Sequence, residues 1–102
     1  MAISHQLHET RSLRMHRMVA ERLRQEPSEV IQFGLKNLER WRQQGVDCDD
    51  FNVWRNLLFT PSFGLVEALT SISEEAVRLR QSSPFAGLIP EETRRQILAS
   101  LE

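Results

Sequence analysis

The chain has 102 residues, of which 40% are hydrophobic and 26% are charged. This length fits one domain with one core, and this composition is that of a folded chain, which excludes disorder over most of its length and a separate substrate domain. The formal net charge of −1 excludes the global cationic field of a dedicated nucleic-acid binder, although a local basic patch could still contact phosphate.

The cysteine content and the hydropathy pattern indicate a compartment. Cys48 is the only cysteine, which excludes an internal disulfide and favours a reducing environment. The first residues lack a basic start followed by an apolar run, and no stretch of about 18 apolar residues could span a bilayer. We therefore expect no secretory signal, no membrane contact and a cytoplasmic location.

Helix breakers divide the sequence into short blocks. Within the blocks apolar residues recur at helical spacing, and no run of β-branched and aromatic residues alternates with polar ones. The sequence predicts an all-α, compact single-domain bundle (1–102) of about five to six short helices. The breakers are Pro27, Gly45, Pro61 with Gly64, Pro84 with Gly87, and Pro90.

The first predicted helix ends at Gln25 and begins at either Ser4 or Thr10. In the second case residues 1–10 would be frayed. A helical projection places its apolar residues on one broad side, which should face the core. These residues are Leu7, Met15, Met18, Val19 and Leu23.

The same helix is basic. Residues 1–25 hold five arginines against two glutamates, a charge of +3, which leaves −4 for the rest of the chain. We expect Arg17 and Glu21 to pair, because they stand four residues apart on the polar side. Arg11 and Arg22 interrupt the apolar side, so their stems should lie along hydrophobic surface with the guanidinium groups reaching out. The polar side comprises Arg14, Arg17, Glu21 and Arg24.

The second predicted helix covers residues 28–43, with Ser28 as N-cap after Pro27 and with Gly45 beyond its end. One continuous stripe should be buried, and it consists of Val30, Ile31, Gly34, Leu35, Leu38 and Trp41. The opposite, solvated side consists of Glu29, Gln32, Lys36, Glu39, Arg40 and Gln43.

The third and fourth predicted helices are short. Asp49 or Asp50 should cap the third, whose apolar face consists of Phe51, Trp54, Leu57 and Leu58. Thr60 and Pro61 form an N-cap and first position for the fourth, with Leu65, Val66 and Leu69 as its apolar residues.

The fifth predicted helix starts at Ser71 or Ser73 and ends near Gln81, with acidic residues in its first turn where the helix dipole favours them. The sixth begins near Pro90, again followed by two glutamates. We expect it to bury Ile97, Leu98 and Leu101.

Metal and cofactor chemistry finds little support. His5, His8 and His16 share a side of the first helix. His8 and His16 are eight residues apart, which is about 12 Å along the helix axis, whereas the ligands of one zinc ion all lie about 2 Å from the metal. Asp47, Asp49 and Asp50 resemble the start of a calcium loop without its glycine and closing glutamate. We predict no metal site and no cofactor.

Catalytic patterns are equally weak. The four glycines are isolated, so a phosphate-binding loop is not indicated. The aspartates around Cys48 disfavour its thiolate, and the paired glutamates 74–75 and 91–92 suit helix first turns better than acid–base chemistry. We therefore predict that the protein is not an enzyme.

The arginines of the first helix have three interpretations: a solvated face, a contact for an acidic protein surface, or a contact for a phosphate backbone. Nucleic acid is the least favoured, because no turn and recognition helix follow.

The segment 78–90 is the most distinctive, because apolar residues occupy a predicted turn. Two interpretations remain open. In one, Phe85 and Leu88 fill the core between the fifth and sixth helices; in the other, Phe85 and Arg80 form an exposed hot spot for a partner.

Three segments resemble a known family: residues 11–24, residues 37–41 and residues 78–87, the last containing Ser-Ser-Pro-Phe-Ala-Gly. They are similar to small helical bacterial proteins encoded beside a nucleotidyltransferase-like protein in an arrangement like that of toxin–antitoxin pairs. The resemblance covers about residues 11–98. It implies a non-enzymatic protein that binds and restrains a toxin-like neighbour.

These observations predict an antitoxin-like protein that neutralises its partner by protein–protein contact. The expected partner-binding residues are Arg11, Arg14 and Arg17 for steering and acidic contacts, with Arg80 and Phe85 as the anchor. The alternatives are a small helical DNA-binding regulator and a structural homodimer.

Overall fold

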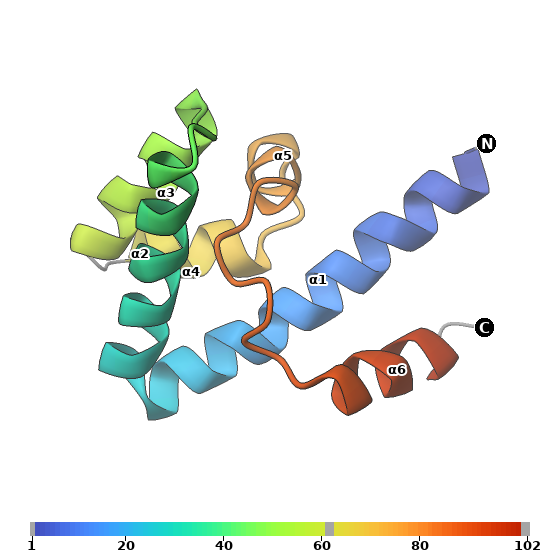
Figure 1. Cartoon of the computed structure of the whole chain (residues 1–102). Coiled ribbons are helices and arrows are strands. Elements are labelled where there is room, and N and C mark those ends of the chain that lie inside the picture. Colours follow the sequence, from blue (N-terminus) through green and yellow to red (C-terminus); the bar gives the residue numbers. More distant parts are fainter. Residues whose placement is uncertain (1, 61–62, 101–102) are drawn as a thin grey trace.

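A computed structural model of the chain describes residues 2–60 and 63–100, with side chains from Leu7 onward. Within these ranges the chain forms helices and no strand, as the sequence predicts (Figure 1). The helices are α1 (Ala2–Gln25), α2 (Pro27–Gln43), α3 (Asp49–Phe59), α4 (Phe63–Thr70), α5 (Glu74–Arg80) and α6 (Glu91–Ser100).

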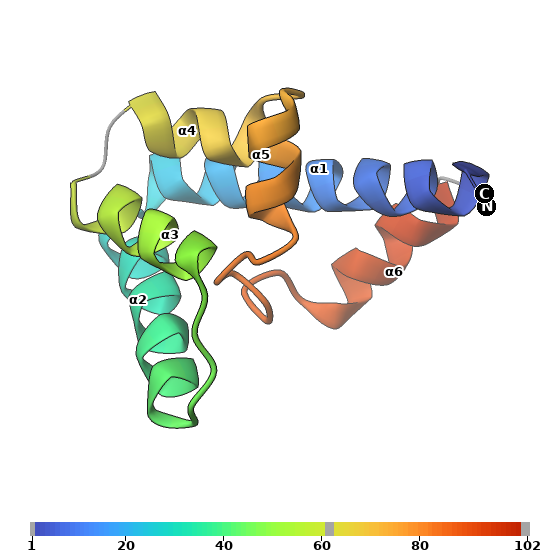
Figure 2. The same cartoon turned by 90° about the horizontal axis from the view of Figure 1, so that it is seen from above.

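Helix α1 is the long central element of the bundle. Its C-terminal half lies among α2, α4 and α5, while α6 runs beside its N-terminal half (Figures 1 and 2). Helix α3 bridges α2 and α4. The radius of gyration is 13.5 Å, close to the roughly 13 Å expected of a compact chain of about 100 residues.

The core lies where α1 to α5 meet. The largest fully buried side chains are Trp54, Leu38, Leu58, Leu65, Leu69, Val30 and Pro84. The predicted stripe of α2 is confirmed, because all its members are buried or half-buried while the opposite side is exposed. The predicted face of α3 is confirmed in the same way, since Trp54 is 0% exposed and donates a hydrogen bond from Nε1 to the Leu79 carbonyl at 2.8 Å.

The predicted N-caps of α2 and α3 are wrong. Pro27, not Ser28, begins α2, and the N-cap position is held by Glu26 without a side-chain cap. Proline suits this first position because its missing N–H would have no helical partner. Helix α3 likewise includes Asp49 in its first turn, with Cys48 at the N-cap position. The N-termini of α2 and α3 are therefore favoured by a residue in the first turn, Pro27 or Asp49, and not by a capping side chain.

One of the two predicted starts of α5 is confirmed. Ser73 is the N-cap, and its Oγ accepts a hydrogen bond from the Ala76 N–H at 3.2 Å. Gly45, beyond the end of α2, has a φ of +83°, a conformation that glycine adopts without strain. Thr60, predicted as the N-cap of α4, is instead the C-cap residue of α3, and its N–H donates to the Asn56 carbonyl. Pro61, predicted as the first position of α4, lies outside the described residues, and α4 begins at Phe63.

Helix α1 begins at Ala2, before either predicted start, so residues 2–10 continue the helix. The predicted pairing of Arg17 with Glu21 is wrong, because Glu21 forms an ion pair with Arg24 at 2.8 Å. That hydrogen bond, together with the positive charge of Arg24, lowers the pKa of Glu21.

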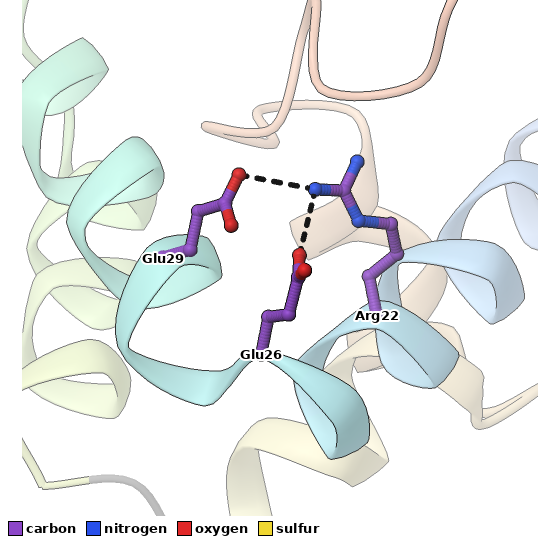
Figure 3. Close-up of polar contacts among 3 residues, drawn as sticks. All are labelled: Arg22, Glu26 and Glu29. Carbon is purple, nitrogen blue, oxygen red and sulfur yellow. Dashed lines mark hydrogen bonds and ion pairs between the residues drawn. The ribbon is translucent and has the colours of Figure 1, made fainter.

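Arg22 joins the first two helices. Its Nη2 donates to Glu26 at 3.0 Å and to Glu29 at 3.2 Å, so one guanidinium lies between two carboxylates (Figure 3). The hydrogen bond from Arg22 is the main reason why the pKa of Glu26 is lowered. The positive charge of Arg22 is therefore matched within the molecule.

Helix α6 differs from its prediction. Ile97 and Leu98 are only half-buried, and none of its residues is fully buried. Leu101, the third residue expected to be buried, lies outside the described residues. The reason is that α6 packs mainly against α1 and is not enclosed by a second helix.

Candidate functional site

The five predicted partner-binding residues do not form one surface. Arg14 and Arg17 are exposed, and Arg11 is half-buried. Arg80 is only 6% exposed and Phe85 only 4% exposed, so the prediction that these two form an exposed anchor is wrong. The other account of this segment is confirmed, because Phe85 and Leu88 belong to the core.

Arg80 is tied down inside the bundle. Its Nη1 donates to the Ala68 carbonyl at 3.1 Å, which connects α5 to α4. Burial lowers the pKa of Arg80, nearby Arg17 lowers it further, and Glu9 partly offsets both effects. A buried guanidinium in this position supports the fold and is not presented to a partner.

The segment 82–87 is held from two sides. On one side, Asn37 of α2 is buried and donates from Nδ2 to the carbonyls of Pro84 at 2.8 Å and Ala86 at 3.3 Å. On the other, Phe85 packs edge-on against Trp54, with ring centroids 5.7 Å apart and an interplanar angle of 89°. These contacts explain why a loop rich in apolar residues is ordered.

His16 of α1 completes this attachment. Its Nδ1 lies 2.6 Å from the Ser12 carbonyl, and its Nε2 lies 2.7 Å from Ser83 Oγ. Nδ1 therefore carries the proton, and Nε2 accepts a hydrogen bond from the Ser83 hydroxyl. Burial lowers the pKa of His16 to about 4; the hydrogen bond to Ser12 opposes this shift and Arg80 adds to it.

A serine hydroxyl on a histidine is also the start of a nucleophilic dyad. In such a dyad the imidazole gains a proton, and its charge is stabilised by a carboxylate. Here a backbone carbonyl stands in that place, and both burial and Arg80 disfavour the charged imidazole. The arrangement suits a structural link between α1 and the loop better than proton transfer.

The three segments that carry the family resemblance meet at this loop. His16 comes from residues 11–24, Asn37 from residues 37–41, and their hydrogen-bond partners from residues 78–87. Segments far apart in the sequence thus share one hydrogen-bonded structure. Of the residues within them that were predicted to bind a partner, Arg80 and Phe85 serve to fix the fold.

The structure presents a surface that the sequence analysis did not single out. Phe59 is 67% exposed and Phe63 76% exposed, and Val66 beside them on α4 is 41% exposed. Phe59 ends α3 and Phe63 begins α4, so these two lie at the same end of the α3–α4 pair (Figure 2). Val66 lies one helical turn along α4 from Phe63, on the same side of that helix. We call Phe59, Phe63 and Val66 the aromatic corner.

A signal for this surface was present in the sequence. Phe63 and Leu65 stand two residues apart, which places them on nearly opposite sides of a helix. Since Leu65 is 1% exposed and packs in the core, Phe63 has to point outward. The sequence pattern groups Val66 with Leu65 and Leu69 as the apolar residues of α4, but of these only Leu65 and Leu69 are buried, and Val66 is exposed beside Phe63.

The described ranges contain neither a candidate metal site nor a membrane-spanning helix. No group of three or more histidine, cysteine, aspartate or glutamate side chains comes together there that could hold a metal ion. No helix in that part of the chain is both long and apolar enough to cross a bilayer. Comparison with protein-family models, with curated proteins and with solved structures yields no match.

Proposed function

We propose that this chain is an antitoxin-like protein of the bacterial cytoplasm, which binds a toxin-like partner through the aromatic corner and neutralises it by protein–protein contact. The observation that carries the contact is the exposure of two phenylalanines, Phe59 and Phe63, at one end of the molecule. The toxin-like character of the partner rests on the resemblance of the three segments described above.

The energetic case concerns the solvation of the aromatic corner. Scattered exposed apolar residues are ordinary, but here two phenylalanines and a valine are exposed within eight residues of sequence, where α3 ends and α4 begins. Aromatic side chains are enriched at the centres of protein interfaces, where they lose their contact with water. A partner covering this surface would bury the rings at little conformational cost, because α3 and α4 already hold their backbones.

Arg14 and Arg17 have a lesser part in the proposal. Both are exposed on α1; Arg17 makes no ion pair within the described residues, and Arg14 donates to Ser100 Oγ of α6 at 2.9 Å. Exposed cations of this kind accelerate the approach of an acidic partner more than they tighten the final complex. We therefore assign them to steering, and the anchor to Phe59 and Phe63.

Co-purification in high salt tests the proposal. The tagged chain is expressed with the neighbouring nucleotidyltransferase-like protein and washed at about 1 M salt, where exposed charge pairs are screened. The complex should persist with the wild-type chain and with Val46→Ser, which changes an exposed apolar residue of the α2–α3 connection, outside the aromatic corner. It should be lost with the double variant Phe59→Ser and Phe63→Ser.

Retention of the complex by the double variant would overturn the role of the aromatic corner. Two other results would favour the alternative functions. Binding to operator DNA that weakens steeply with salt would indicate a regulator. A dimer of the chain alone, converted to a monomer by the double variant, would indicate that the aromatic corner serves self-association.

A further inference from the structure

A cleft of about 490 Å³ lies between the N-terminal half of α1, the loop after α5, and α6. Its volume is within the range of small-molecule sites in proteins, roughly 300 to 1,000 Å³. Neither Phe59 nor Phe63 lines it, so it is separate from the aromatic corner. The cleft exists because α6 covers α1 without burying any of its own residues fully.

The charged residues that line the cleft are all basic. Arg11, Arg80 and Arg94 contribute to its wall, and no described aspartate or glutamate does. Arg80 is engaged with the Ala68 carbonyl, and Arg94 pairs with Glu91 at 3.3 Å. Arg11 is the remaining cation of the wall.

Arg11 lacks any partner of its own. It forms no hydrogen bond or ion pair with the described residues, and its Nε is buried with no acceptor. A cation without a counter-charge or an acceptor leaves free energy of binding available, and Arg11 is in the wall of the cleft. An anion in the cleft could pair with this guanidinium, which matches a carboxylate with two parallel hydrogen bonds.

The rest of the wall is largely apolar. Met15 of α1 faces the cleft together with Ile97 and Leu98 of α6, and both α6 residues are only half-buried. His16 also contributes, but both of its ring nitrogens already have partners in Ser12 and Ser83. A ligand with an apolar body would cover these side chains and complete the packing of α6 on α1.

We propose that this cleft binds a small amphipathic carboxylate, with its anionic head on Arg11 and its apolar body between α1 and α6. The charge of the wall selects an anion, and the unpaired guanidinium of Arg11 places its head. The apolar side chains select an aliphatic or aromatic body. An inorganic anion would leave the apolar wall uncovered, and a neutral amphiphile would leave Arg11 without an acceptor. The site goes beyond the proposed function and does not depend on it.

Decanoate is the probe, and two related compounds test its charge and its apolar chain separately. Decan-1-ol keeps the chain without the charge, and acetate keeps the charge without the chain. Titration of the isotope-labelled chain, below the concentrations at which decanoate forms micelles, should give saturable NMR shifts at the Arg11 Nε–H and at the Ala86 and Gly87 amides. Each methylene removed from the acid should weaken binding about fourfold, as the burial of apolar chain predicts.

Paired variants assign the head group. Arg11→Gln should weaken decanoate binding about tenfold or more, whereas Arg17→Gln, also on α1 but outside the cleft wall, should leave it unchanged. The amide spectrum of each variant reports whether the fold is intact. The loss of binding in Arg11→Gln should be absent with decan-1-ol, which has no charge for Arg11 to recognise.

Three results would overturn the proposal. The first is equal affinity for decan-1-ol and decanoate, which would make the cleft merely apolar. The second is equal decanoate binding by Arg11→Gln and Arg17→Gln. The third is an absence of saturable shifts at the cleft, or shifts confined to the aromatic corner. Failure of any kind here leaves the co-purification result for the aromatic corner untouched.

Discussion

The region of α2 to α5 and the region of α6 use their apolar residues differently. In the first, helices enclose one another, and Trp54, Leu38 and Leu58 are at most 1% exposed. In the second, α6 rests mainly on the N-terminal half of α1, and no residue of α6 is fully buried. The first region holds the core, and the second borders the cleft.

The difference follows from the number of apolar residues that each helix can bury against its neighbours. Helix α2 has a stripe of six apolar or small residues and meets neighbours along it, whereas the described part of α6 offers mainly Ile97 and Leu98. Local opening costs little where few apolar contacts are lost. The comparison therefore separates a stable platform, which carries the aromatic corner, from a looser lid over the cleft.

The largest expected effect comes from the centre of the core. Trp54→Ala should lower the free energy of unfolding by about 3 to 5 kcal/mol, because it leaves a cavity and removes the hydrogen bond to Leu79. Trp41→Ala is the matched control, since Trp41 is only half-buried beside Phe51. Urea unfolding followed by circular dichroism measures both, and equal losses would contradict the assignment of the core.

The second effect depends on pH. Because His16 has a pKa of about 4 in the folded chain against 6.5 when unperturbed, the unfolded state binds more protons between these values. The free energy of unfolding should therefore fall as pH is lowered from about 7 towards 4, by about 3 kcal/mol in total. Urea unfolding at several pH values measures this slope.

His16→Gln provides the control for that slope. Its amide can still contact Ser83, but it does not titrate, so the dependence between pH 6.5 and 4.5 should largely disappear. The carboxyls of Glu21, Glu26 and Glu39 have pKa values lowered below 4.5 and add their own losses only under more acid conditions. An unchanged slope in His16→Gln would mean that His16 is not the buried neutral group.

A third, smaller effect concerns Gly34, where α2 approaches its neighbours closely. A Cβ at this position would lie 2.9 Å from Leu58 Cδ1 and 3.1 Å from Phe85 Cε1. Gly34→Ala gains about 1 kcal/mol in helix propensity, but overpacking costs about 1 to 3 kcal/mol, so we expect a net loss of about 1 kcal/mol in urea unfolding. Adding Leu58→Val should recover part of it, and a stabilised single variant would contradict the close packing.

The smallest effect is expected in α6. Ile97→Ala should cost less than about 1 kcal/mol of unfolding free energy, whereas Leu58→Ala in the core should cost about 2 to 5 kcal/mol. Both substitutions delete aliphatic side chains, so the difference between the two losses of free energy reports how fully each residue is enclosed by neighbouring helices. Comparable losses in urea unfolding would show that α6 is part of the main core and would remove the contrast between the two regions.

Much of the fold was predictable because local pattern and burial agree. The stripe of α2 and the Ser73 cap of α5 each follow from residues close in the sequence. The start of α2 was misplaced by one residue because Ser28 and Pro27 both suit a helix beginning. The burial of α6 was overestimated, because its apolar residues indicate which face packs but not whether a second helix encloses that face.

The attachment of the loop 82–87 was harder to predict because its parts are distant in the sequence. The partner of His16 is Ser83, 67 residues away, and no helical projection contains that contact. The burial of Phe85 depends on Asn37 and Trp54, so the loop sequence alone allowed both a plug and an exposed anchor. Residues that look distinctive in a sequence can be distinctive for the fold.

Hydrogen exchange of the free chain, read by mass spectrometry, tests the division of the molecule most directly. We predict that amides of α6 exchange by local opening, at rates insensitive to the stability of the core. Amides in the middle of α2 and α3 should exchange only through global unfolding and should slow or quicken with the measured free energy of unfolding. If α6 is protected as strongly as α2 and α3, and loses protection together with them in Trp54→Ala, then the molecule is one cooperative unit and the account of a platform with a loose lid is wrong.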